Sequence, residues 1–249
     1  MNLAVPCFCF YSTSSPELTK ETFHVAGKDL HIYKAPKFDS GFSGTFLTGQ
    51  SLWPSAKVLA LYLTLIAKTV KSASGVLELG SGPGLVGLTA AQLAADTRGK
   101  VILTDHEERV LQITRMNIAA NFPSQSDSPR CAHLTWGENV EEFRKQHGQF
   151  DLILGSDIVY NEDAIPRLFR TVQALLALND CSTFLLAYDT RGGWLDGQVD
   201  RHSEQVGLER EDIVIAEIPA CKQLLASIEW DYPLEDKLRL LKFTKKAER

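Results

Sequence analysis

Short apolar runs alternate with amphipathic ones between residues 75 and 188. The apolar runs are rich in leucine and β-branched residues, which is typical of strands buried on both faces of a parallel sheet. They are GVLELG (75–80), KVILTD (100–105), CAHLTW (131–136), DLILGSD (151–157) and STFLLAY (182–188). Between them, apolar residues at helical spacing predict helices at 85–95, 107–121 and 164–178. This alternation predicts an α/β fold built on a doubly wound sheet.

The flanking segments extend this arrangement. Before the sheet, Phe23–Val25 and Leu30–Tyr33 enclose the turn sequence AGKD, which predicts a β-hairpin. Pro54 then opens an apolar run at 55–69 that we expect to be helical. After residue 188, RHSEQVGL (201–208) is expected to close a further helix, and DIVIAEIP (212–219) and LRLLKF (238–243) are expected to form two late strands.

The pattern contains no repeat, and no linker divides it after the hairpin. Residues 1–50 are interpreted as an N-terminal extension that carries the hairpin, with residues 1–19 as a loosely ordered lead-in. Residues 51–249 are interpreted as one domain with a mostly parallel sheet of seven strands. A chain of 249 residues is long enough to bury such a core without disulfides or metals.

The composition excludes several classes of partner and indicates a cellular compartment. The net charge of -5 argues against the basic face of a nucleic-acid-binding domain. The cysteines form no repeating framework, which indicates reduced thiols inside the cell: they are Cys7, Cys9, Cys131, Cys181 and Cys221. No histidines show metal-ligand spacing, so we expect no metal. No apolar run reaches the roughly 20 residues of a membrane span. We expect a cytoplasmic monomer, with the nucleus as the alternative compartment, that binds neither nucleic acid nor membrane.

A glycine-rich turn, VLELGSGPGLVG (76–87), follows the first strand of the predicted sheet. Its glycines let the backbone approach a ligand, and the next helix offers free N–H groups. Gly82, Gly84 and Gly87 match the dinucleotide pattern G-x-G-x-x-G, which alone is weak evidence. Glu78, inside the strand, would repel a pyrophosphate and suits a phosphate-free cofactor with an ammonium group, such as S-adenosyl-L-methionine (SAM). SAM is therefore favoured over NAD; the alternative without a ligand is a tight turn in which Glu78 binds neighbouring amides.

The second strand ends in LTDHEE, which places Asp105 beside the glycine turn at the same edge of the sheet. An acid at this position bonds a ribose diol in nucleoside-binding sheets. Asp105 is therefore the candidate ligand for a ribose. The alternative is that its side chain caps the following helix.

Several separated segments carry a resemblance to one group of proteins. They are LTGQSLWPSA (47–56), VLELGSGPGLVGL (76–88), VILTD (101–105), LTWGE (134–138) and DLILGSDIVYNED (151–163). The last contains the pattern D-x-x-Y at Asp157 and Tyr160. From about Gly44 to Pro219 the chain resembles the seven-strand class I SAM-dependent methyltransferases, and within them the family 16 (methyltransferase-like) protein-lysine methyltransferases. This resemblance implies a Rossmann-like fold and SAM as cofactor, with S-adenosyl-L-homocysteine as its product.

The resemblance, together with Glu78, implies a cofactor site of eight residues: Trp53, Glu78, Gly80, Ser81, Gly82, Asp105, Trp136 and Ser156. Trp53 would offer an aromatic face to the cationic groups of SAM. Trp136 would close over the adenine ring, and Ser156 would lie at the edge of the cofactor. For both tryptophans the alternative is packing in the core.

The resemblance also implies that Asp157 and Tyr160 are catalytic residues for methyl transfer to a lysine ε-amine. The substrate would be a protein, with chaperones and translation factors as candidate classes. Asp157 would hold the amine by a charge-assisted hydrogen bond and Tyr160 would orient it; the alternative is a helix cap and a packing residue. Arg191 and Asp189 are expected at the substrate rim or in a simple surface pair. Alternative functions are methylation of histidine or of a small molecule on the same fold, and a non-catalytic adaptor.

Overall fold

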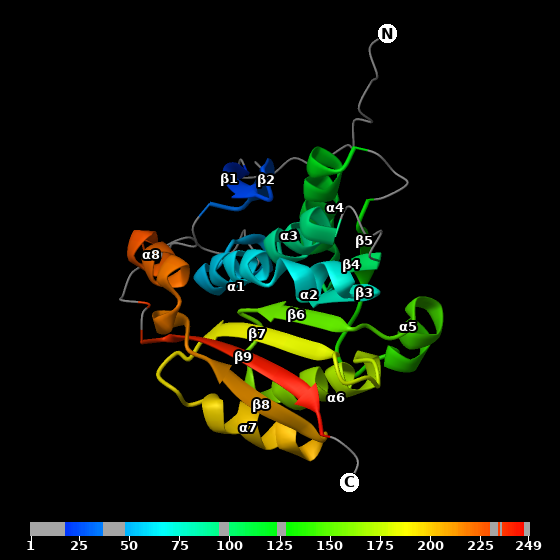
Figure 1. The fold of residues 1–249 in the computed structure, drawn as a ribbon. Helices are drawn as coiled ribbons and strands as arrows, with labels where there is room; N and C mark the ends of the chain where they lie inside the picture. Colours follow the sequence, from blue (N-terminus) through cyan, green and yellow to red (C-terminus); the bar gives the residue numbers. More distant parts are fainter. Residues whose placement is uncertain are drawn as a thin grey trace.

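The computed structural model describes residues 18–36, 48–94, 100–123, 128–229, 234 and 236–246, with only the backbone of Lys100. The predicted lead-in (1–19) lies outside the described residues up to residue 17, Cys7 and Cys9 included, and its last residue, Thr19, begins a strand instead. In the described part, one sheet has the strand order β5-β4-β3-β6-β7-β9-β8 (Figure 1). Its strands are β3 (Gly75–Leu79), β4 (Lys100–Asp105), β5 (Arg130–His133), β6 (Leu152–Ser156), β7 (Thr183–Asp189), β8 (Leu208–Ile213) and β9 (Leu238–Lys245). The strand β9 pairs antiparallel with β7 and β8, and the other pairs are parallel. The predicted α/β sheet of seven mostly parallel strands is confirmed.

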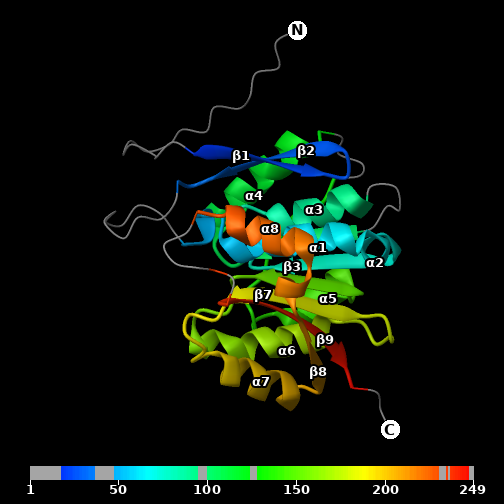
Figure 2. The same cartoon turned by 60° about the vertical axis from the view of Figure 1, so that its left-hand side comes forward.

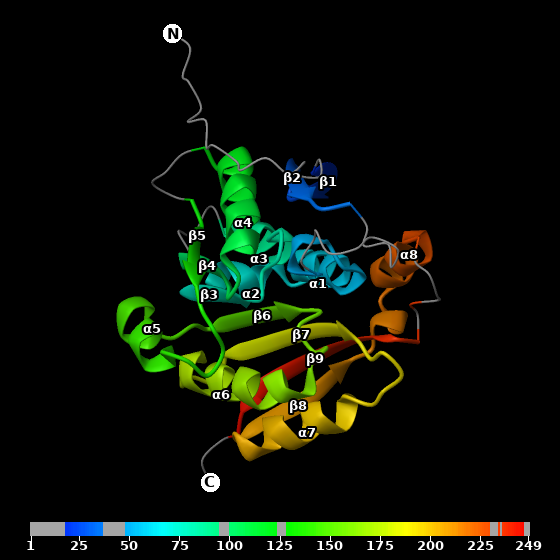
Figure 3. The ribbon, with the colours of Figure 1, turned by 180° about the vertical axis from the view of Figure 1, so that it is seen from behind.

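Helices cover both faces of this sheet (Figures 1 and 3). One face carries α1 (Pro54–Leu65), α2 (Ala67–Ser72), α3 (Leu85–Ala94), α4 (Glu108–Asn121) and α8 (Pro219–Ser227). The other carries α5 (Val140–His147), α6 (Ile165–Leu175) and α7 (Asp196–Gln205). Successive strand side chains point to opposite faces, so Val76 belongs to the apolar cluster under α1 and α3 and Leu77 to the one under α6.

Amphipathic spacing explains why the helices lie where they do. In α6, Leu168, Phe169 and Val172 are fully buried against the sheet, while Arg167 and Arg170 face solvent. Each such buried apolar side chain contributes about 1.5–3 kcal/mol to folding.

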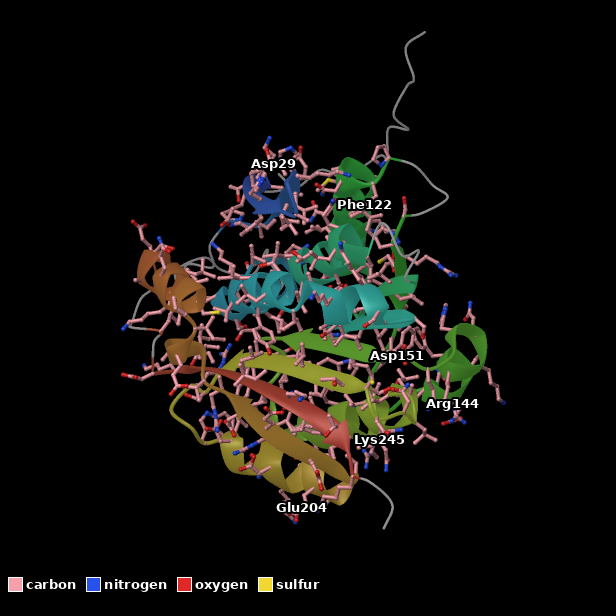
Figure 4. The ribbon with its side chains drawn as sticks, in the orientation of Figure 1. Asp29, Phe122, Arg144, Asp151, Glu204 and Lys245 are labelled. Atoms are coloured by element: carbon pink, nitrogen blue, oxygen red, sulfur yellow. The ribbon has the colours of Figure 1, made fainter. Side chains whose placement is uncertain are left out.

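The predicted N-terminal hairpin is confirmed as β1 (Thr19–Val25) and β2 (Lys28–Lys34). It lies across α3 and α4 (Figure 2). Two amides of α4 hold it: Asn121 pairs with the N–H and carbonyl of His31 at 2.7 and 2.8 Å, and Asn117 pairs with those of Tyr33 at 2.8 Å each. Its apolar side chains share the core cluster of α1 and α3. In Figure 4, Asp29 of the hairpin and Glu204 of α7 mark opposite sides of the sheet. The division of the chain at residue 50 stays a prediction.

The strand predicted at 212–219 is wrong in most of its length. β8 begins and ends earlier, and the chain continues through the short helix η3 (Ile215–Glu217) into α8, where Pro219 takes the first helical position. The sequence of β8, LEREDI, is charged because this strand lies at the exposed edge of the sheet, so it gives no apolar signal. The run IVIAEI resembles a strand, but Val214 is exposed, Ile215 is buried, and Ile213 and Ile218 pack partly on the core around η3 and α8.

Other boundaries also differ from the predictions. The helix expected at 55–69 is two helices, because the chain turns at Ile66. β5 ends at His133, and residues 134–136 leave the sheet. The helix α5 was not predicted, because Phe143 is its one buried residue and the rest is polar.

Two findings bear on the compositional expectations. Among the described residues, no helix is long and apolar enough to cross a membrane. Within the same part of the chain, Cys131, Cys181 and Cys221 are free thiols, and no group of three or more His, Cys, Asp or Glu residues is arranged to hold a metal ion.

Candidate active site

A cavity of about 470 Å³ lies at the carboxyl ends of β3, β4 and β6. The register of the sheet creates it: Leu79 pairs with Thr104 of β4 and with Gly155 of β6, so the residues that follow come out side by side. All ten predicted site residues line this cavity, namely Trp53, Glu78, Gly80, Ser81, Gly82, Asp105, Trp136, Ser156, Asp157 and Tyr160. Ligand sites of open α/β sheets lie at this edge. The structure thus brings the candidate residues together, and their individual roles stay predictions.

The glycine turn has the backbone that its sequence predicts. Gly80, Gly82 and Gly84 all have positive φ, of 63°, 52° and 90°, a region that side chains other than glycine rarely adopt. A Cβ on Gly80 would lie 2.6 Å from Cγ2 of Ile158, and one on Gly82 would lie 3.0 Å from the carbonyl oxygen of Gly49. The absence of side chains therefore lets Ile158 and the backbone of Gly49 pack directly against the turn.

A substitution in this turn tests how tightly the turn is packed. Gly80→Ala is expected to lower the free energy of unfolding by about 2–4 kcal/mol, because left-handed strain adds to the clash with Ile158. Gly207→Ala is the matched control: Gly207 also has a positive φ, of 73°, but open space surrounds its Cβ position, so only about 1 kcal/mol of strain is expected. Urea unfolding of both variants gives the comparison. Equal losses would show that the contact with Ile158 costs nothing.

Glu78 is the buried acid of the site. It is 1% exposed, and its Oε2 accepts a hydrogen bond of 2.9 Å from the N–H of Gly87 in α3. Burial raises the pKa of this carboxyl to about 8; the Gly87 N–H opposes this change and the nearby Asp105 adds to it. With this pKa Glu78 carries a proton over much of the neutral range, and a cation in the cavity would favour its ionised form.

Asp105 accepts a hydrogen bond from the glycine turn and does not cap the N-terminus of the following helix, α4. Its Oδ2 accepts from the N–H of Gly82 at 3.3 Å and its Oδ1 from the N–H of Glu107 at 3.1 Å. The N-cap of α4 is Glu107, whose carboxylate accepts from the N–H of Arg109. The alternative of Asp105 as the helix cap is therefore wrong. The Asp105 carboxylate also raises the pKa of the neighbouring His106 imidazole, which lies at the rim.

The two tryptophans are half-buried at the walls of the cavity. Trp53 donates from Nε1 to the carbonyl oxygen of Thr48 at 3.1 Å, and the guanidinium of Arg191 lies 5.6 Å from its ring centroid. Trp136 packs partly on the core below α6 and reaches toward Gly80. Trp136 therefore combines core packing with a face toward the cavity, whereas the ring of Trp53 already contacts a cation.

Asp157 stands where β6 leaves the sheet, with a φ of 53° that Asp and Asn tolerate better than most residues. Its backbone N–H donates to the carbonyl oxygen of Ala187, and its carboxylate accepts from the hydroxyl of Ser55 and from the N–H of Asp189 at 3.2 Å. The alternative of Asp157 as a helix cap is wrong, because the short helix η2 (Glu162–Ala164) is capped by Asn161. Tyr160 is 47% exposed at the cavity, which excludes a role as a core packing residue.

Sequence reasoning missed several residues of the site. Ser55 bonds to Asp157 across 102 positions of sequence, and no local pattern could reveal that contact. Six further residues also line the cavity: Thr48, Gly49, Ser51, Leu52, Leu134 and Thr135. Arg191 lines the cavity too, in agreement with its expected place at the rim. Its backbone N–H donates a hydrogen bond of 2.8 Å to the carboxylate of Asp189.

Two buried hydroxyls give an independent sign that the cavity takes a polar ligand. Within the described part of the chain, Ser51 Oγ and Ser81 Oγ are buried without a hydrogen-bond partner. Both residues line the cavity. A buried hydroxyl without a partner is unfavourable, so a bound polar group that pairs with it contributes to affinity.

Residues 43–205 match the profile of a family described as lysine methyltransferase. The chain belongs to the lysine methyltransferase family. This lysine methyltransferase family member is 40% identical over 137 residues to mouse protein N-lysine methyltransferase METTL21A, covering 55% of this chain and 58% of that one. It is 31% identical to mouse protein-lysine methyltransferase METTL21E over 67% of this chain and 64% of that one. To EEF1A lysine methyltransferase 3 of Xenopus tropicalis it is 40% identical over 40% of this chain and 41% of that one. The chain spans only 58%, 54% and 52% of the METTL21A proteins of mouse, zebrafish and Xenopus tropicalis.

Solved structures share the fold of this lysine methyltransferase family member. The rRNA methyltransferase RsmC of Thermus thermophilus, in complex with AdoMet and guanosine, superposes with a TM-score of 0.58 at 14% identity, over 92% of this chain and 51% of that one. An O-methyltransferase of Bacillus cereus in complex with SAH superposes with a TM-score of 0.54 at 13% identity, over 79% of this chain and 82% of that one. These likenesses show the methyltransferase fold, as the sequence predicted.

Proposed function

We propose that this protein transfers a methyl group from SAM to the ε-amine of a lysine in a protein substrate. The observation that carries the proposal is the position of Asp157 and Tyr160, the D-x-x-Y pattern, in the same cavity as the glycine turn and Glu78. Membership of the lysine methyltransferase family supports the choice of acceptor. The methyltransferase fold supports the choice of donor.

The residues of the cavity fit the cofactor. Glu78 supplies a buried acid for the ammonium group, while Ser81 and Ser51 supply hydroxyls in need of a partner. Asp105, at the end of the neighbouring strand β4, has further lone pairs on its carboxylate that can accept hydrogen bonds from a ribose diol. Trp53 offers a face that already accepts a cation. When bound, the cofactor supplies a methyl group on a positively charged sulfur and leaves as S-adenosyl-L-homocysteine.

Asp157 and Tyr160 prepare the amine for its attack. A lysine ammonium has a reference pKa of about 10.4, so it must first lose a proton to solvent. Burial raises the pKa of the Asp157 carboxyl, whereas hydrogen bonds from Ser55 and from the Asp189 N–H lower it. The Asp157 carboxylate holds the amine by a charge-assisted hydrogen bond, and it acts by orientation more than by basicity. Burial also raises the pKa of the Tyr160 phenol, so Tyr160 stays neutral and borders the lysine at the mouth.

A protein with an exposed lysine is the proposed partner. The Xenopus tropicalis relative is an EEF1A lysine methyltransferase, which makes a translation elongation factor the first candidate here. Chaperones are the second candidate class. Methylation of histidine or of a small molecule, and an adaptor role without transfer, are the competing functions.

Labelling identifies the acceptor. The purified protein, incubated with tritiated SAM and a cell extract, is expected to label protein bands whose acid hydrolysate contains the tritium in methylated lysine. Label in methylhistidine would support the histidine alternative, and wild-type protein that labels nothing would support the adaptor. Isothermal titration with SAM and with NAD tests the cofactor separately: binding of NAD without binding of SAM contradicts the proposal.

A further inference from the structure

The Asp157 carboxylate is part of a ring of four contacts. The hydroxyl of Ser55 donates to its Oδ2, and the N–H of Asp189 donates to its Oδ1 at 3.2 Å. The carboxylate of Asp189 in turn accepts from the N–H of Arg191 at 2.8 Å. The guanidinium of Arg191 lies over the ring of Trp53, two residues before Ser55. The ring therefore joins three segments that lie far apart in the sequence.

Ser55 occupies an unusual place for a serine. It is the second residue of α1 and is fully buried. The N-cap of α1 is Trp53, which makes no side-chain cap bond, and Pro54 takes the first helical position. The hydroxyl of Ser55 thus contributes nothing to the start of its own helix and is directed at Asp157 instead. A buried side chain with one polar contact, made to a candidate catalytic group, indicates a role at that group.

We propose that Ser55 is a positioning residue, which fixes the Asp157 carboxylate in the orientation that receives the substrate amine and helps to keep it charged. This inference rests on the proposed function. The two donors bind different oxygens of Asp157, so rotation about the last side-chain bond would break both. Each oxygen keeps a further lone pair, which is available to an amine in the cavity.

The groups around Asp157 explain why the hydroxyl of Ser55 affects the charge of this carboxyl. Burial is the largest influence on the pKa of this carboxyl and raises it; the Asp189 carboxylate also raises it, while Arg191 lowers it. The bond from Ser55 is the largest of the influences that favour the charged form. Removal of the hydroxyl should therefore raise the pKa of Asp157 and discharge it at mildly acidic pH.

Kinetics over a pH series tests the inference. At saturating SAM, kcat/KM of Ser55→Ala for the protein substrate is expected to fall about tenfold below wild type at the acidic end of the series and to approach wild type toward the alkaline end, because more of Asp157 is protonated in the variant than in wild type as the pH falls. The deprotonation of the lysine affects both proteins alike and cancels in their ratio. Thr64→Val, which removes a hydroxyl bonded within α1 to Leu61, is the matched control and should follow wild type at every pH. A constant ratio of Ser55→Ala to wild type over the whole series would overturn the proposal.

A second measurement needs no substrate and so separates this inference from the proposed function. Carbon-13 NMR of aspartate-labelled protein follows the titration of the Asp157 carboxyl, assigned by its absence in Asp157→Asn. The midpoint is expected to rise by about one pH unit in Ser55→Ala and to stay unchanged in Thr64→Val. An unchanged midpoint in Ser55→Ala refutes the role of Ser55, whether or not the protein transfers methyl groups. A midpoint that rises in Ser55→Ala, together with wild-type protein that labels no substrate, would refute the proposed function and leave the contact in place.

Discussion

Without SAM, Glu78→Gln is expected to have a higher free energy of unfolding than wild type above neutral pH. Burial raises the pKa of Glu78 from the ordinary value of 4.5 to about 8, so the folded chain holds this proton more tightly than the unfolded chain does. The stabilisation that this proton gives is complete below pH 4.5 and is lost as the pH rises through 8. The loss is about 1.4 kcal/mol per pH unit within that window, a few kcal/mol in all.

Glutamine avoids this loss because it does not titrate and can still accept the N–H of Gly87. Thermal unfolding between about pH 5 and about pH 9 measures the difference, in which the other titrating groups cancel. The two proteins should have similar stability at the acidic end and diverge toward the alkaline end. Glu142→Gln, exposed on α5, is the matched control and should follow wild type. Parallel curves for Glu78→Gln and wild type would contradict the assigned burial of a titrating acid.

The same variant should lose affinity for SAM by about tenfold to a hundredfold, since the charge that pairs with the ammonium group is gone. Wild-type Glu78 must also give up its proton when that cation binds, so SAM binding near neutral pH should release a proton. Calorimetry in two buffers with different heats of ionisation detects this release. Glu78→Gln should release none. SAM binding that is equally tight in both proteins would show that Glu78 does not face the ammonium group.

Asp157→Asn is expected to lower kcat by about a hundredfold to a thousandfold while SAM affinity stays within a factor of about three. Asparagine tolerates the positive φ of this position and keeps the shape of the side chain, so the fold should persist. What is lost is the charge that holds the amine. Methyl transfer to the labelled protein substrate and isothermal titration with SAM measure the two effects separately.

Asp180→Asn is the matched control for this change. Asp180 is exposed in the connection between α6 and β7, at the opposite end of the strand from the cavity. Its substitution should leave both kcat and SAM affinity unaltered. If Asp157→Asn retained more than about half of the wild-type kcat, the carboxylate would have no part in holding the amine.

The glycine turn, the buried strand that precedes it and the acids at two strand ends could all be predicted from the sequence. These signals are local: backbone freedom at Gly80 and Gly82, and strand register set by apolar residues, act over a few positions. Because parallel strands end at one edge, the sequence also implied that Glu78, Asp105 and Asp157 would converge. The structure brings them into one cavity.

Edge elements escaped prediction for a physical reason. β8 is charged because water, and not a neighbouring strand, covers one of its sides. The short helix η3 replaced part of an expected strand, because its Ile215 is buried in the same apolar cluster as Cys221 and Leu225 of α8. An apolar run alone does not determine whether its residues pack as a strand in the sheet or as a helix on the core.

The sequence by itself determined the α/β fold, the glycine turn and the identity of the acids, because each depends on neighbours within a few residues. Only the tertiary structure decided how those acids are held. The hydroxyl of Ser55 meets Asp157 across 102 positions, Asn117 meets the hairpin across 84, and burial by many elements together sets the pKa of Glu78. Such contacts depend on packing between distant segments, which no local pattern encodes.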